Sequence, residues 1–154
     1  MTQDLFGYMK GTWTFEREIL LNNSKKNYGN ASGKAIWETT TIAHTLQYHE
    51  TGKLLINETQ HQQAFFRNYQ YRITEEGLDI YFDDELTQNF NLYQQYVFQK
   101  GINKLIPKEV HVCNKDLYEG DFTLTNENHF VHTSIVTGPH KDYIIITRYK
   151  REQP

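Results

Sequence analysis

Hydrophobic and polar residues alternate along much of the chain, which is the pattern of β-strands with one buried face. The clearest run spans residues 11–19. Its apolar face carries Trp13, Phe15 and Ile19, and its other face is polar. Arg17 falls in the apolar row, and a charged side chain on a buried face needs a partner or a ligand. The pattern therefore predicts a first strand that brings an arginine into the interior.

The same alternation predicts further short antiparallel strands separated by polar turns. The predicted strands are residues 34–41, 45–49, 54–74 (as one bent strand or two), 78–82, 90–96, 110–122, 130–136 and 142–149, after a short helix within residues 2–9. Residues 21–33 are predicted as a polar loop and 50–53 as a turn. About nine or ten strands in one 154-residue domain (1–154) predict an all-β, up-and-down barrel, since closure removes exposed strand edges.

Composition narrows the classes of function. A net charge of −3 argues against a nucleic-acid-binding surface, which needs clustered basic residues. The single cysteine excludes an internal disulfide and suits a reducing compartment. With no apolar leader and no run long enough to span a membrane, we expect a cytoplasmic protein without a membrane partner, as a monomer or homodimer.

Residues 111–118 hold an imidazole, a thiol, a carboxylate and a phenol, and are predicted to lie within one strand with a bulge. His111 and Cys113 would share a face, but positions i and i+2 lie about 6–7 Å apart, too far for His111 to activate the thiol directly. No third ligand stands at a spacing typical of a metal site, so no metal is predicted. No cofactor is predicted either, and haem ligation by His111 or His132 is the alternative.

Two motifs resemble the lipocalin superfamily of ligand-binding barrels. A short helical lead before Gly11-x-Trp13 resembles the G-x-W that opens the first strand of that fold. The resemblance implies a basic residue from the last strand, Arg148 or Arg151, stacked on Trp13.

The whole chain also resembles a poorly characterised bacterial family of small lipocalin-like (calycin-type) barrels of unassigned function. The matching elements are G-x-W-x-F-x-R at residues 11–17, Y-x-E-x-G at 48–52, R-x-Y-x-Y-R at 67–72, H-x-C-x-x-D-x-Y at 111–118 and G-P-x-K-D-Y at 138–143. The resemblance implies the same closed barrel, similar to fatty-acid-binding proteins.

The predicted interior suggests binding of a small acidic or amphipathic molecule. Arg17 and Arg67 would hold its anion, because a guanidinium binds a carboxylate through paired hydrogen bonds. The other predicted ligand contacts are Tyr69, His111, Tyr118 and Trp37. Mutual satisfaction of the buried charges, Arg17 with Glu50 and Arg67 with Asp116, is the competing interpretation, and it would fit a ligand-free structural or regulatory domain.

Catalysis is the other alternative. Arginine, tyrosine and glutamate in a small barrel resemble the phenolic-acid decarboxylases, and this resemblance implies a lyase or decarboxylase acting on an aromatic or unsaturated carboxylic acid as the alternative function. The catalytic candidates are Glu50, Tyr48 and His111, and a catalytic carboxyl group would need a pKa raised by burial. The sequence does not decide whether the protein is an enzyme, and binding without catalysis is favoured.

Overall fold

A computed structural model describes residues 4–83, 91–99, 101–109, 111–113, 116–139 and 141–153, and for residues 111–113 and 116 it describes the backbone alone. The elements are α1 (Leu5–Met9), β1 (Gly11–Leu21), β2 (Asn27–Thr39), β3 (Thr45–Ile56), β4 (His61–Ile73), β5 (Gly77–Phe82), β6 (Leu92–Phe98), β7 (Lys104–Pro107), β8 (His111–Cys113), β9 (Asp116–Asn126), β10 (His129–Thr137) and β11 (Asp142–Arg151).

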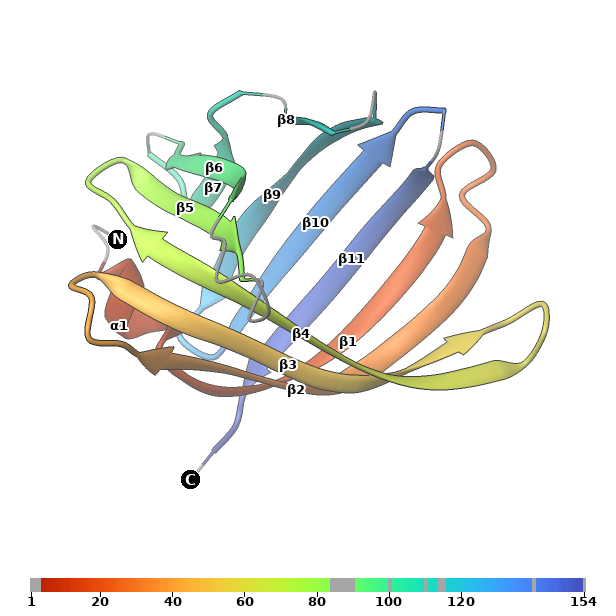
Figure 1. Cartoon of the computed structure of the whole chain (residues 1–154), viewed down its shortest axis with the longest axis horizontal. Helices are drawn as coiled ribbons and strands as arrows, with labels where there is room; N and C mark the ends of the chain where they lie inside the picture. Colours follow the sequence, from red (N-terminus) through yellow and green to blue (C-terminus); the bar gives the residue numbers. More distant parts are fainter. Residues whose placement is uncertain are drawn as a thin grey trace.

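The strands form one antiparallel sheet that closes on itself (Figure 1). Most strands pair with their neighbours in the chain, β1 also pairs with β11, and β9 pairs with both β7 and β10. Ten strands therefore complete the barrel, and β8 lies beside β9 at its edge. The all-β, up-and-down barrel with a short N-terminal helix is confirmed.

Three sequence predictions about individual elements are wrong. Residues 27–33 belong to β2 rather than to a loop, because small residues such as Gly29 and Ala31 fill its inward positions and give little hydrophobic signal. Residues 50–53 continue β3 instead of turning. Residues 111–118 are not one strand, since β8 and β9 pair antiparallel with His111 opposite Tyr118.

A close approach of two backbones explains how β3 runs through its apparent turn signal. Gly52 of β3 lies directly opposite Gly33 of β2. A Cβ atom on Gly33 would meet the Thr51 carbonyl oxygen at 2.0 Å. The facing glycines, Gly33 and Gly52, therefore permit the tight pairing of β2 and β3. In the sequence alone, Gly52 resembles a turn residue.

One end of the barrel is closed by α1 and a cluster of aromatic rings. Asp4 caps the helix by accepting a hydrogen bond from the Gly7 N–H at 2.8 Å, and Leu5 and Met9 are buried. Trp13 donates its indole N–H to the Met9 carbonyl at 2.9 Å. The Arg151 guanidinium lies 4.2 Å from the Trp13 ring centre, which confirms Arg151 as the predicted stacking partner.

The aromatic cluster forms a floor inside the barrel. Trp37 is 1% exposed and lies among the rings of Trp13, Tyr48, Phe130 and Tyr149, with centroid distances of 4.5–6.1 Å. Such tilted and edge-on contacts add to the apolar burial itself. In the described part of the chain, no helix has the length and apolar character needed to cross a membrane.

Candidate ligand cavity

A cavity of about 270 Å³ lies above the aromatic floor. It is lined by Arg17, Ile19, Ala31, Tyr48, Glu50, Leu54, Gln63, Phe65, Arg67, Tyr69, Tyr71, Ile80, Tyr93, His132, Ser134, Ile145, Thr147 and Tyr149. The cavity opens along β4, because β5 pairs only with Tyr69–Ile73 and no described strand pairs with this edge of residues 61–68. Gln63 and Arg67 are exposed at this mouth.

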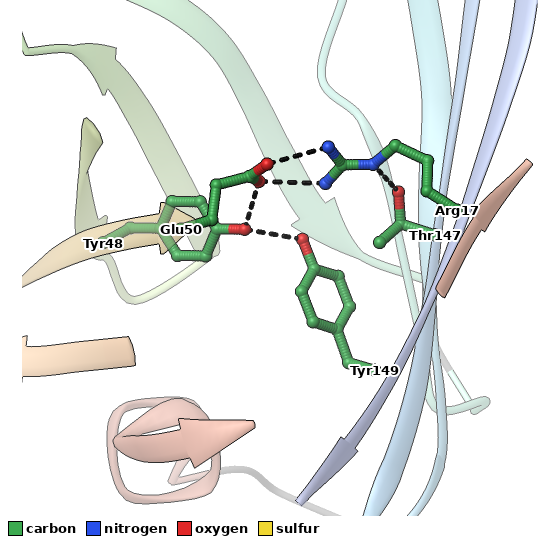
Figure 2. A network of polar contacts seen from close by, with 5 residues as sticks. All are labelled: Arg17, Tyr48, Glu50, Thr147 and Tyr149. Atoms are coloured by element: carbon green, nitrogen blue, oxygen red, sulfur yellow. Dashed lines mark hydrogen bonds and ion pairs between the residues drawn. The ribbon is translucent and has the colours of Figure 1, made fainter. Parts of the chain in front are cut away.

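Arg17 of β1 and Glu50 of β3, the two strands that flank β2, form a two-fold hydrogen-bonded ion pair (Figure 2). Arg17 Nη1 donates to Glu50 Oε2 at 2.8 Å, and Nη2 donates to Oε1 at 2.9 Å. Arg17 Nε donates to the Thr147 hydroxyl at 2.8 Å. The two charged side chains are only 12% and 3% exposed, so the pairing predicted by the ion-paired interpretation is confirmed for Arg17.

Opposing effects set the protonation of this pair. Burial by itself raises the pKa of Glu50, but the hydrogen bonds and positive charge of Arg17 outweigh it and hold that pKa below its ordinary value. Burial likewise lowers the pKa of Arg17, and Glu50 more than reverses the effect. Both groups are therefore ionised at neutral pH, and their charges cancel.

Two tyrosines extend the network beneath the ion pair (Figure 2). Tyr48 donates its hydroxyl to Glu50 Oε1 at 2.5 Å, and its oxygen lies 2.9 Å from the Tyr149 hydroxyl oxygen. Burial raises the pKa of Tyr149 to about 12 and that of Tyr48 well above its ordinary value. Both phenols stay protonated and already have partners inside the protein.

Arg67 differs from Arg17 in having no such partner. It lies directly opposite Glu50 in the β3–β4 pairing, yet it makes no hydrogen bond or ion pair with any described residue. Its charge contributes to the lowered pKa of Glu50, after the larger effects of burial, Arg17 and Tyr48. The cavity thus has one guanidinium at its mouth that is not neutralised by a direct contact.

His132, for which the sequence suggested only haem ligation, lines the cavity. Its ring stacks on Phe122 with centroids 4.0 Å apart, and its Nε2 lies 3.3 Å from the Tyr96 hydroxyl oxygen. Burial, followed by the charge of Arg17, lowers the pKa of His132 to about 3, so the ring is neutral at physiological pH. The alternation in residues 130–136 places His132 and Ser134 in one row, and this signal was available from the sequence.

The other predicted site residues lie elsewhere. Trp37 belongs to the floor beneath the cavity and is not on its wall, and its indole nitrogen has no hydrogen-bond partner in the described structure. Tyr118 lies outside the cavity lining, with its hydroxyl oxygen 3.5 Å from Lys141 Nζ. The side chain of His111 is outside the described residues. Within those residues, no group of three His, Cys, Asp or Glu side chains is placed to hold a metal ion.

Comparison with known proteins identifies a family and a fold. The model of DUF6314, a family of unknown function, matches residues 9–151. No curated protein matches the chain. The S-type phycobiliprotein lyase CPES from Guillardia theta superposes with a TM-score of 0.66 at 7% identity, covering 98% of this chain and 92% of the lyase.

Designed barrels give weaker superpositions. A de novo fluorescence-activating β-barrel has a TM-score of 0.46 at 9% identity, covering 97% of this chain and 99% of the design. The redesigned barrel mFAP1, solved with DFHBI bound, has a TM-score of 0.44 at 10% identity, covering 94% and 96%. At these identities the likeness concerns the barrel fold, so a function has to be argued from the cavity itself.

Proposed function

We propose that the chain, which belongs to DUF6314, a family of unknown function, binds a small amphipathic organic anion in its barrel cavity. The observation that carries this proposal is the unneutralised guanidinium of Arg67 at the mouth of an aromatic cavity of about 270 Å³. A barrel filled by its own side chains, with every arginine ion-paired, would instead have favoured a structural domain.

The charge balance of the cavity favours one anionic group. The charges of Arg17 and Glu50 cancel each other, and burial keeps His132 neutral. Arg67 then leaves the described lining with a net charge of +1. A carboxylate, sulfonate or phosphate group bound at Arg67 would gain charge-assisted hydrogen bonds.

The remaining lining favours an apolar, ring-bearing body for the ligand. Phe65, Tyr69 and Tyr93 surround the cavity near Arg67, and Ile19, Leu54, Ile80 and Ile145 add aliphatic surface. Tyr69 and Tyr93 stack with centroids 6.0 Å apart, which gives a rigid aromatic wall. Small-molecule sites commonly combine such apolar walls with a few polar groups that fix orientation.

The geometry favours binding over the acid–base chemistry of a lyase. A general acid at neutral pH needs a raised carboxyl pKa, whereas the pKa of Glu50 is lowered. Both Glu50 oxygens already accept hydrogen bonds, one from Arg17 and the other from Arg17 and Tyr48. Glu50 therefore has the role of a counter-ion, which fixes Arg17 in place.

The proposal is tested with trans-cinnamate and its neutral analogue trans-cinnamamide as probes, by isothermal titration calorimetry. Wild type should bind the acid more tightly than the amide. Arg67→Gln should weaken cinnamate binding about fivefold to tenfold, the modest effect expected of a charge pair that is partly screened by water. The affinity for the amide should change less than twofold.

Arg148→Gln is the matched control, because Arg148 is an exposed arginine that pairs with Glu18 outside this cavity. It should leave both affinities unchanged. Failure of cinnamate to bind at millimolar concentration, or an equal loss of cinnamate affinity in both arginine variants, would contradict cavity binding of an anion.

A further inference from the structure

Three successive inward side chains of β4 end in polar groups that have no hydrogen-bond partner among the described residues. Arg67, Tyr69 and Tyr71 all line the cavity and alternate along one face of the strand. Neither tyrosine hydroxyl makes a hydrogen bond to any described residue, and the same holds for the Arg67 guanidinium. Unpaired polar groups in an interior are costly unless water or a ligand satisfies them.

The wall made by β1, β3 and β11 is different. There Arg17, Glu50, Thr147, Tyr48 and Tyr149 form the connected network of Figure 2, in which each polar end has at least one partner inside the protein. A ligand that replaced these contacts would have to break strong hydrogen bonds. The cavity therefore has one internally satisfied wall and, on β4, one wall with unused hydrogen-bonding capacity.

The row on β4 also runs from solvent to interior. Arg67 is exposed, Tyr69 is partly buried and Tyr71 is 3% exposed. Arg67 and Tyr71 are four positions apart along the strand, which corresponds to about 13 Å along the backbone. A cationic group thus marks the mouth and a phenol marks the deep end of a single row.

From this arrangement we infer that the ligand is an elongated organic acid that lies along β4, with its acidic group at Arg67 and a neutral hydrogen-bond acceptor, such as a carbonyl oxygen, at Tyr71. This inference rests on the proposed function and adds the ligand's orientation and its second polar end. Burial raises the pKa of Tyr71 well above its ordinary value, so its hydroxyl keeps the proton that it would donate. An acid with an apolar far end would leave that hydroxyl unsatisfied.

Two acids of matched size separate this inference from simple binding of anions. The far-end group of 4-acetylcinnamate carries a carbonyl oxygen, and that of 4-isopropylcinnamate has nearly the same shape without one. Wild type should bind the acetyl acid about fivefold more tightly, the ratio that one net neutral hydrogen bond gives. Tyr71→Phe should abolish this ratio of affinities by weakening the binding of 4-acetylcinnamate alone.

Arg67→Gln serves as the second variant. It should weaken the binding of both acids by the same factor, so that the ratio of their affinities persists. Thermal unfolding of Tyr71→Phe checks that the barrel is intact, since the removed hydroxyl has no partner in the described structure. Equal affinity of wild type for the two acids, or a ratio that survives Tyr71→Phe, would overturn the orientation. Absence of binding by both acids would instead contradict the proposed function.

Discussion

Glu50→Ala is expected to lower the free energy of unfolding by about 3–5 kcal/mol, the range for breaking a buried ion pair by removing one partner. The substitution removes both carboxylate hydrogen bonds of the Arg17 guanidinium, whose side chain is 12% exposed, and so leaves its charge without its counter-ion. It also removes the acceptor of the Tyr48 hydroxyl. Urea unfolding followed by tryptophan fluorescence measures the change.

The pairing is tested more strictly by a double-mutant cycle. Arg17→Met should lower the free energy of unfolding by a similar amount, because Glu50 would then keep only the Tyr48 hydrogen bond. The double variant Arg17→Met/Glu50→Ala should lower the free energy of unfolding by less than the two single substitutions combined, since it leaves no uncompensated charge. If the losses of unfolding free energy in the two single variants simply add in the double variant, the proposed coupling between Arg17 and Glu50 is contradicted. Glu18→Ala, which breaks the exposed pair with Arg148, should cost at most about 1 kcal/mol.

His132 is expected to make the barrel less stable in mild acid. Its pKa is about 3 in the folded protein, against about 6.5 in an unfolded chain. As the pH falls through 6.5, the unfolded chain takes up a proton that the folded protein does not, so stability declines progressively until the folded pKa is reached. Between pH 7.5 and pH 5.0 this difference amounts to a loss of about 2 kcal/mol.

Urea unfolding at the two pH values provides the test. His132→Phe keeps an aromatic ring against Phe122 but removes the titrating group, so about 2 kcal/mol of the pH dependence should vanish. His61→Gln replaces an exposed histidine and should leave the pH dependence unchanged. An identical loss of stability in wild type and His132→Phe would show that other groups cause it.

Strand alternation predicted the barrel well wherever inward residues were large. Trp13 and Phe15 are buried in β1, as their two-residue period predicted, and Arg17 points inward in the same row. The pattern failed in β2, where glycine and alanine occupy inward positions, and at Gly29 and Gly33 the backbones of β2 and β3 approach closely. A close approach of two strands is a property of the folded sheet, which a single stretch of sequence does not contain.

The site was predictable in its residue types and less so in their roles. Alternation placed Arg17, Glu50 and Arg67 in the interior, and the structure places all three on one cavity. The sequence could not show which arginine is neutralised. Glu50 lies opposite Arg67 in the strand pairing but binds Arg17 of β1, on the other side of β2, and the sequence does not show such a contact between two strands that are not paired with each other.

Residue-resolved titration with trans-cinnamate tests the central claim, that the cavity binds a small organic anion. We expect ¹H–¹⁵N spectra of the labelled full chain to show saturable shifts of the Arg67 and Tyr69 amides, with smaller changes at Arg17 and Thr147 across the cavity. In Arg67→Gln the same shifts should saturate at higher cinnamate concentration. Shifts confined to residues outside the cavity, or spectra that stay unchanged at millimolar cinnamate, would contradict the account.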